Sequence, residues 1–243
     1  MTPPLFLLDV LPAGDELLLS GDEGRHAARV RRVQVGETVL VSNGRGGLLE
    51  CTVTAFVGEA VRLRVVGRTT VLGWQPQLAV VQALPKGDRG ELAVEVMTEL
   101  GVDEIVPWSA SRSIVQWRGD RGAKALSKWR STAREASKQS RRARVPVVAE
   151  LASTADVVRR IGTAAATLVL HADADATLVS AAMPLTGSVV VIIGPEGGIA
   201  PDELTAFADA GAVPVRLGAT VLRTSTAGPA ALAALSVRLG RWG

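Results

Sequence analysis

The chain has 243 residues, of which 47% are hydrophobic, and a formal net charge of +3. This length allows one large domain or two modest ones, and the apolar fraction is sufficient for a packed core. The single cysteine excludes an internal disulfide, no apolar run reaches the roughly 20 residues of a membrane span, and the N-terminus lacks the basic region of a secretory signal. These features predict a cytoplasmic protein that makes no contact with membranes.

Residues 1 to about 70 show the alternation of apolar and polar residues that is typical of half-buried strands. Segments 37–42 and 48–54 flank the glycine-rich turn Asn43–Gly47 and predict a hairpin, and segment 60–66 predicts another strand. Cys51 lies within this alternation and is expected to be a small packed residue. Several short strands in so small a segment predict a compact barrel. A short helix is expected before the hairpin, and it carries a basic cluster of Arg25, His26, Arg29, Arg31 and Arg32.

A domain boundary is expected between Gly67 and Pro76, where this pattern changes. Beyond it, short apolar runs alternate with helical periodicities, which favours a mostly parallel sheet covered on both faces. Strands are expected at 78–84, 103–108, 167–171, 189–193 and 213–217, and helices at 88–100, 124–138, 154–161, 204–210 and 228–239. The two expected domains are residues 1–72 and residues 73–243.

Positive charge is concentrated in one segment of the chain. Residues 112–144 contain eleven basic side chains and two acidic ones, Asp120 and Glu135, which gives a local charge of +9 (eleven minus two). So basic a stripe is the expected footprint of a phosphate backbone and predicts contact with nucleic acid. A solvated, arginine-rich helix face is the alternative interpretation.

A glycine-rich loop follows the strand expected at 189–193 and precedes a helix start at Pro201. In parallel α/β sheets, ligands bind where such loops leave the strand ends, because backbone N–H groups point outward there. A second loop of this kind follows the strand at 213–217, and the pair predicts a small-molecule site built largely from backbone. The sequence lacks the spacings of P-loop, dinucleotide, zinc and serine hydrolase sites.

Several short blocks occur in order along nearly the whole chain, and together they resemble the bacterial 16S ribosomal RNA uridine N3-methyltransferases of the SPOUT superfamily. These blocks are Lys86–Arg89, Glu99–Val102, Ser111–Ser113, Ala133–Arg142, Ile193–Gly198, Leu217–Gly218 and Val221–Thr224. In addition, Gly24–His26 with Arg29–Arg32 is similar to the N-terminal RNA-binding segment of that family.

The resemblance implies an α/β protein with a small N-terminal PUA-like β-barrel in residues 1–72. Residues 73–243 would form a SPOUT methyltransferase domain with a deep trefoil knot, a rare exception to the rule that chains are unknotted. The family implies a homodimer that binds S-adenosyl-L-methionine in the knot and needs no metal. Its substrate would be 16S ribosomal RNA within the 30S subunit, methylated at N3 of a uridine in the decoding region.

The resemblance also assigns residues to binding roles. Cofactor binding is expected of Leu170, His171, Gly194, Pro195, Glu196, Gly197, Gly198, Leu217, Gly218, Val221, Leu222, Arg223, Thr224, Ser225 and Thr226. RNA binding is expected of Arg25, His26, Arg29, Arg31, Arg32, Lys86, Arg89, Arg112, Arg134, Lys138, Arg141 and Arg142.

Arg223 and Glu196 are the expected catalytic residues, because they are the polar side chains nearest the expected position of methyl transfer. Uracil N3–H must lose its proton before it can attack, and Arg223 is expected to stabilise the resulting charge on the carbonyl oxygens. Glu196 is a candidate base, with organisation of the glycine-rich loop as its alternative role. The family pattern has an acid where this chain has Ser225, so a second candidate base is missing.

Two alternative functions remain open from the sequence. A SPOUT methyltransferase could act instead on a ribose 2′-hydroxyl or on transfer RNA. A protein that retained the fold without turnover could serve as a small-subunit assembly factor.

Overall fold

The computed structural model describes residues 2–242, and contacts divide the chain into two compact units. The N-terminal unit comprises Met1–Gly73 together with Ser137–Val145. The C-terminal unit comprises Trp74–Ala136 together with Pro146–Gly243. The N-terminal unit is therefore assembled from two segments that are far apart in the sequence.

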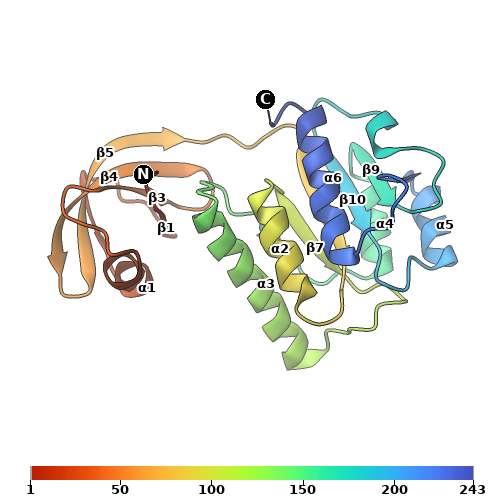
Figure 1. The fold of residues 1–243 in the computed structure, drawn as a ribbon, viewed down its shortest axis with the longest axis horizontal. Coiled ribbons are helices and arrows are strands. Elements are labelled where there is room, and N and C mark those ends of the chain that lie inside the picture. Colours follow the sequence, from red (N-terminus) through yellow and green to blue (C-terminus); the bar gives the residue numbers. More distant parts are fainter. Residues whose placement is uncertain (1, 243) are drawn as a thin grey trace. The chain divides into compact units, whose positions relative to one another are not determined.

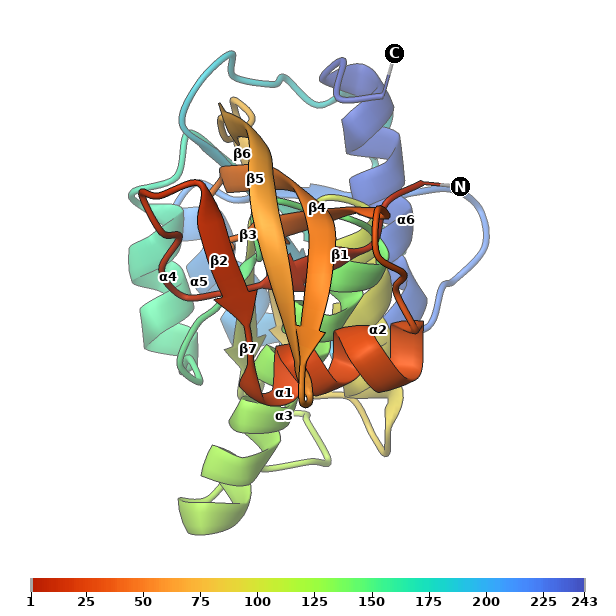
Figure 2. The same ribbon diagram turned by 90° about the vertical axis from the view of Figure 1, so that its left-hand side faces the viewer.

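The described part of the N-terminal unit contains five strands in one sheet, of order β1-β3-β4-β5-β2 (Figure 2). The edge strand β1 is parallel to β3, and the other neighbours are antiparallel. The elements are β1 (Leu5–Leu7), β2 (Glu16–Leu19), α1 (Gly21–Arg25), a π-helical turn η1 (His26–Arg31), β3 (Thr38–Ser42), β4 (Gly47–Val57) and β5 (Ala60–Thr70).

The hairpin and the short helix predicted for this unit are both confirmed. β3 and β4 pair from Thr38 with Thr52 to Ser42 with Leu48, across the glycine-rich turn. Cys51 is fully buried in the core of the sheet, and burial raises the pKa of its thiol to about 11. Cys51 is therefore a packed residue rather than a nucleophile.

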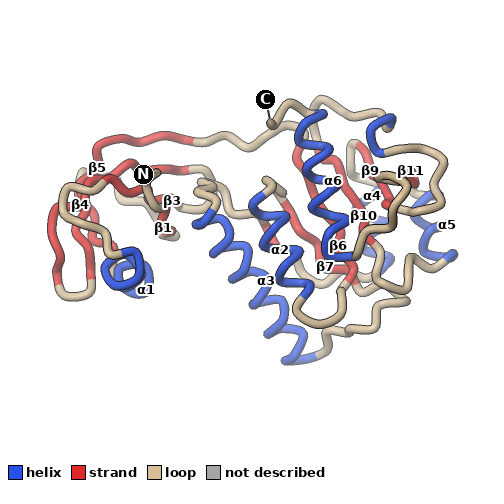
Figure 3. Tube along the Cα trace, in the orientation of Figure 1, coloured by secondary structure: helices blue, strands red, loops and turns tan. Residues whose placement is uncertain are grey.

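The described part of the C-terminal unit contains a six-stranded parallel sheet, of order β11-β9-β10-β6-β7-β8. Figure 3 labels all of these strands except the short β8. No helix within residues 2–242 is long and apolar enough to cross a bilayer. The elements are β6 (Gln77–Ala83), α2 (Arg89–Glu99), β7 (Glu104–Trp108), α3 (Gly119–Gln139), β8 (Val147–Val148), α4 (Thr154–Ile161), β9 (Ala166–Leu170), a 3₁₀ turn η2 (Leu178–Ser180), β10 (Ser188–Ile193), α5 (Pro201–Asp209), β11 (Val213–Val215) and α6 (Thr224–Arg238).

Helices cover both faces of this parallel sheet, as the sequence predicts. α2, α3 and α6 lie on one face of the sheet, and α4 and α5 lie on the other (Figure 1). Side chains of α2, α3 and α6 share one apolar core with the sheet, and those of α4 and α5 share a second core with it. The central strands β6 and β10 are buried along nearly their whole length, in keeping with their largely apolar sequences. The chain is thus a mixed α/β protein.

A buried arginine near the C-terminus fastens the end of the chain to the sheet. The Arg241 side chain is 3% exposed and pairs through Nη2 with Oδ2 of Asp103 at 2.7 Å. It also donates to the carbonyl oxygens of Gly101 at 3.0 Å and Pro76 at 2.6 Å. The same Oδ2 of Asp103 accepts the backbone N–H of Leu78 at 2.8 Å. These bonds join the segment after α6 to the residues that begin β6 and β7.

Candidate functional site

Three neighbouring parallel strands end on the same edge of the C-terminal sheet. β9, β10 and β11 end at Leu170, Ile193 and Val215, and each is followed by a loop. Backbone groups at the carboxyl ends of parallel strands are free to meet a ligand. This edge is therefore the place where the fold can hold a small molecule.

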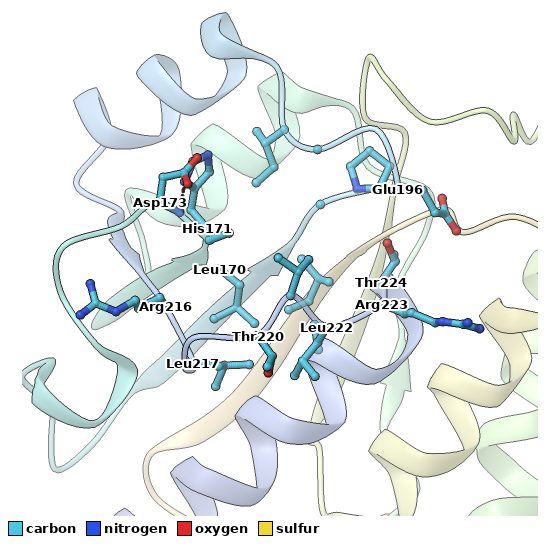
Figure 4. Close-up of a pocket in the computed structure, with 18 of the residues that line it drawn as sticks. Leu170, His171, Asp173, Glu196, Arg216, Leu217, Thr220, Leu222, Arg223 and Thr224 are labelled. Carbon is cyan, nitrogen blue, oxygen red and sulfur yellow. Dashed lines mark hydrogen bonds between the residues drawn. The ribbon is translucent and has the colours of Figure 1, made fainter.

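The loops after these strands surround a cavity of about 530 Å³. This volume lies within the roughly 300–1,000 Å³ that is usual for small-molecule sites. Leucine side chains supply apolar walls, and the first turn of α6 contributes Thr224 (Figure 4). The lining residues are Arg89, Arg112, Leu170, His171, Ala172, Asp173, Ile193, Gly194, Pro195, Glu196, Gly198, Ile199, Val215, Arg216, Leu217, Gly218, Thr220, Val221, Leu222, Arg223, Thr224 and Ala227.

Glycines make the loop after β10 compact. A Cβ atom on Gly194 would lie 2.7 Å from Cγ1 of the buried Ile199, and Gly198 has a φ of +73° that side chains disfavour. Gly197 has a different role, because a Cβ there would lie 3.3 Å from both Cβ and the backbone oxygen of Arg112. Nη1 of Arg112 donates to the Gly197 carbonyl at 3.3 Å. Gly194 and Gly198 thus shape the wall of the cavity. Because Gly197 has no side chain, the segment that carries Arg112 can pack closely against the loop.

A buried carboxylate fixes the position of that segment. Glu203 is 3% exposed and accepts hydrogen bonds from the Ser111 N–H at 2.9 Å, the Thr154 hydroxyl at 2.9 Å and the Ala200 N–H at 3.2 Å. Three donors satisfy a carboxylate that would otherwise be costly to bury. The residue before Arg112 is therefore held against the first turn of α5.

The loop after β9 forms another wall and is held by Arg216. Nη1 of Arg216 donates to the carbonyl oxygens of Ala174 at 2.6 Å and Asp175 at 2.9 Å. Within the loop, Nδ1 of His171 accepts the Asp173 N–H at 3.3 Å. These bonds fix the backbone on which His171 and Asp173 line the cavity (Figure 4).

Glu196, Arg223 and Thr224 lie at the opposite end of the cavity from His171, Asp173 and Arg216 (Figure 4). Oε1 of Glu196 accepts the backbone N–H of Lys86 at 3.1 Å, which ties the glycine-rich loop to the loop after β6. Arg223 precedes the first residue of α6, and its side chain has no acidic partner within residues 2–242. One end of the cavity therefore combines a tethered carboxylate with an unpaired guanidinium group.

All but three of the residues expected to hold a cofactor line this one cavity. The exceptions are Gly197, Ser225 and Thr226. The sequence predicts the last helix from residue 228, but α6 begins four residues earlier, at Thr224. Positions 225 and 226 are therefore helical rather than part of a loop, and Ser225 is only 4% exposed. The cavity receives Thr224 and Ala227, which share one face of the helix.

Sequence reasoning missed several residues that line the cavity, above all Asp173, Arg216 and Thr220. Asp173 follows His171 by two residues in the loop after β9, and this position after a strand end is a sequence signal that predicts a residue of the site. Arg89 and Arg112 were expected on an RNA-binding surface, whereas the structure places them on the wall of this cavity.

Within the described residues, no group of three or more His, Cys, Asp or Glu side chains could hold a metal ion.

The basic residues expected to bind RNA differ in their surroundings within the N-terminal unit. Arg25 and Arg29 both pair with Glu59, whereas Arg31 and Arg32 are exposed. Lys138 is buried, which its sequence did not indicate. Its side chain is 4% exposed, and Nζ donates to Oε1 of Glu23 at 2.9 Å and contacts Nδ1 of His26 at 3.1 Å. Lys138 therefore lies inside the unit and contacts Glu23 and His26.

A second, smaller cavity of about 90 Å³ lies within the N-terminal unit. His26, Arg31, Lys138 and Arg141 line it and give it a positive charge. Arg31 and Arg141 are exposed at their side chains and can meet an anion from solvent. The remaining predicted RNA contacts are the exposed Lys86 and the half-buried Arg134 and Arg142.

Comparisons with known proteins match both parts of the chain. Residues 74–236 match the RNA methyltransferase domain family, and residues 19–56 match the RNA methyltransferase PUA domain family. The ribosomal RNA small subunit methyltransferase E of Mycobacterium bovis is 47% identical over 247 residues, covering 100% of this chain and 94% of that protein. The protein of the same name from Bacillus subtilis is 27% identical, covering 90% of this chain and 88% of that protein. The crystal structure of ribosomal RNA small subunit methyltransferase E from Neisseria gonorrhoeae bound to S-adenosyl methionine matches with a TM-score of 0.85 and 26% identity, covering 98% of each chain.

Proposed function

Because this chain belongs to the ribosomal RNA small subunit methyltransferase E family, we propose that it methylates N3 of one uridine in the decoding region of 16S ribosomal RNA. Its substrate is the RNA within the 30S subunit, its methyl donor is S-adenosyl-L-methionine, and its place of action is the cytoplasm, where that subunit is assembled. The observation that carries the proposal is the cavity at the carboxyl ends of β9, β10 and β11, lined by two loops rich in glycine and leucine.

The cavity has the properties that S-adenosyl-L-methionine requires. Leu170, Leu217 and Leu222 offer apolar surface for adenine and ribose, and backbone groups of the Gly194–Gly198 loop are accessible because Gly194 and Gly198 lack side chains. We therefore assign cofactor binding to the leucine side chains and the loop backbone that line this cavity. When bound, the cofactor supplies an electrophilic methyl group on a sulfonium, and the protein supplies position and electrostatics.

Gly194→Val should weaken cofactor binding by about 10- to 100-fold. The valine side chain would overlap Ile199, whose Cγ1 lies 2.7 Å from the position that a Cβ atom at residue 194 would occupy, so the loop must move. Isothermal titration calorimetry with S-adenosyl-L-methionine measures the change. Gly36→Val, at a positive-φ turn of the N-terminal unit, is a control for general destabilisation and should leave the affinity unchanged. Equal affinity of Gly194→Val and the wild-type protein would contradict the placement.

The reaction requires the imide N3–H of uracil to lose its proton, because the neutral nitrogen is a poor nucleophile. N3 lies on the Watson–Crick edge, so the base must first be exposed from pairing and stacking. Arg223 stands at the end of the cavity near Glu196 and can stabilise negative charge on the uracil carbonyl oxygens. Glu196 holds the Lys86 N–H through one of its oxygens, which favours organisation of the glycine-rich loop as its role.

We assign the two parts of the chain to two tasks, with the boundary near residue 72. Residues 1–72, completed by Ser137–Val145, bind RNA as a PUA-like β-barrel, in which β1 and β2 are the strands that closure would bring together. Residues 73–243 form a SPOUT methyltransferase domain, whose two cofactor loops belong to a deep trefoil knot. The active form is a homodimer, which is supported by Val221, 82% exposed at the cavity, and Leu222, 39% exposed there.

Neutralising Arg31 and Arg141 should weaken RNA binding and reduce its salt dependence. Each arginine that contacts phosphate contributes about 0.7 to 0.9 to the slope of log affinity against log salt. Arg31→Gln with Arg141→Gln should therefore flatten the slope by roughly 1.4 to 1.8, measured by filter binding to 16S ribosomal RNA at several salt concentrations. Arg159→Gln removes one exposed positive charge from α4 and should change the slope little. An unaltered slope in the double variant would remove these arginines from the RNA-binding surface.

The proposed function is tested with small subunits from cells that lack this protein. Mass spectrometry of their 16S ribosomal RNA should show the loss of one N3-methyluridine, and purified protein with labelled S-adenosyl-L-methionine should restore it. A missing 2′-O-methyl group or a missing transfer RNA modification would support the alternative substrates. Subunits that bind the protein and gain no label would support a non-catalytic assembly factor.

A further inference from the structure

Three arginines from different chain segments line the cavity near Glu196. Arg89 is the first residue of α2, Arg112 lies after β7, and Arg223 precedes α6. The bond from the Lys86 N–H to Glu196 brings the start of α2 to this end of the cavity. The bond from Arg112 to the Gly197 carbonyl brings the second segment to the same loop.

None of these three guanidinium groups forms an ion pair with a carboxylate of residues 2–242. Within residues 2–242, the side chains of Arg89 and Arg223 make no ion pair or hydrogen bond, and Arg112 donates to a carbonyl rather than a carboxylate. Glu196 is the acid at this end, so the local charge is +2 (three positive minus one negative). Arg89 is half-buried, and Arg112 and Arg223 are exposed. The arrangement suits an anion that arrives with the substrate.

We propose that Arg89, Arg112 and Arg223 form one anion-binding subsite that receives the deprotonated uracil imide of the substrate. This inference rests on the proposed function and deepens it, because it assigns Arg89 and Arg112 to the reacting base instead of the RNA backbone. Each guanidinium offers up to five N–H donors to the two carbonyl oxygens beside N3. The proton leaves N3 to water, the N3 lone pair forms the new bond to the methyl carbon, and the sulfonium sulfur leaves as a thioether.

In this arrangement Glu196 is an anchor that opposes ionisation of the base. Its Oε1 holds the Lys86 N–H, and its negative charge destabilises an anion nearby. The other charged or titratable side chains on the cavity wall are His171, Asp173 and Arg216, which lie at the far end (Figure 4). Removal of an arginine and removal of the Glu196 charge should therefore act on the uracil in opposite directions.

The test is the pH dependence of methyl transfer under single-turnover conditions, with small subunits that lack the modification. The rate should rise with pH and level off above the pKa of the bound uracil N3–H. Arg89→Met should move this midpoint upward by about one pH unit or more, because a nearby positive charge lowers the pKa of an acid by roughly 1–3 units. Arg112→Met should also raise it, and Glu196→Gln should lower it and keep turnover. Arg89→Lys retains the charge and should stay near the wild-type midpoint.

Control variants isolate the effect of this subsite on the bound base. Arg159→Met removes an exposed arginine of α4 and should leave the midpoint unchanged. A His171→Gln background removes the imidazole side chain from the far end of the cavity wall. Calorimetry with S-adenosyl-L-methionine confirms that each variant is folded. Unchanged midpoints in Arg89→Met and Arg112→Met, or abolished turnover in Glu196→Gln, would overturn the subsite. Absence of N3-methyluridine with the wild-type protein would instead overturn the proposed function.

Discussion

Arg223→Ala is expected to lower the rate of methyl transfer at neutral pH by about 10²- to 10³-fold, the usual effect of losing one donor to a developing anion. The reason is positional, since Arg223 lies beside Glu196 at the end of the cavity and no acid of the described chain neutralises it. Affinity for S-adenosyl-L-methionine should change by less than about threefold, because the leucine and backbone surfaces of the cavity remain. Single-turnover assays and calorimetry on the same preparation measure the two effects.

Comparing the loss of methyl-transfer rate with the loss of cofactor affinity distinguishes a catalytic role of Arg223 from a role in cofactor binding. Comparable losses of rate and cofactor affinity would mean that Arg223 binds the cofactor and does not act on the base. Arg216→Ala is a matched control, because Arg216 lines the far end and holds the loop that carries Asp173 through backbone carbonyls. That variant should weaken cofactor binding more than it slows transfer from the saturated enzyme.

Arg241→Met is expected to destabilise the protein by about 3–5 kcal/mol, the range for breaking a buried ion pair by removing one partner. The change leaves the Asp103 carboxylate and the carbonyl oxygens of Pro76 and Gly101 without the guanidinium that now satisfies them. Methionine fills a similar volume, so loss of packing contributes little. Urea unfolding followed by circular dichroism gives the free energy of unfolding.

An exposed arginine provides the reference for this effect. Arg159 pairs with Asp156 at the surface of α4, with 73% of its side chain exposed, so Arg159→Met should shift the urea midpoint only slightly. Equal shifts of the midpoint in both variants would show that the contacts of Arg241 do not stabilise the fold. Arg241→Lys should fall between the two, because lysine keeps the charge but cannot reach three acceptors in one plane.

The sequence was most informative where burial and periodicity agree. The apolar run 189–193 appears as β10, and the alternating segments of the first 70 residues appear as β3, β4 and β5. Short edge strands were not individually predicted, because β1, β2 and β8 contain only two to four residues each. Such strands are specified by their neighbours in the sheet and carry little periodic signal of their own.

The start of α6 shows why part of the site was misplaced. Gly228 and Pro229 suggest a helix start, since proline is tolerated in a first turn. In the structure Pro229 lies inside α6, which begins at Thr224. Gly228 packs closely against α2, because a Cβ there would lie 2.9 Å from Sδ of Met97. A tertiary contact therefore determined the role of this glycine, and the sequence alone could not reveal it.

The number of charged residues follows from the sequence, but the position of each charge in the fold does not. Lys138 belongs to the most basic segment, yet its ammonium group is enclosed beside Glu23, 115 residues away in the chain. Arg216 looked like an ordinary strand residue, and its bonds to Ala174 and Asp175 depend on how two loops meet. Long-range partners of this kind require the fold.

Because the N-terminal unit draws on residues 137–145, a fragment that ends at Gly73 would lack part of its own interior. Glu23 would lose the Lys138 ammonium group, and the Ser42 hydroxyl would lose the Ala143 carbonyl that it now meets at 2.8 Å. The complete unit therefore cannot be transferred to another protein as one continuous segment of sequence, because it is built from two separate segments. Any recombination event that exchanged the first 73 residues with those of a relative would have to preserve a matching surface more than sixty residues downstream (137 minus 73 is 64).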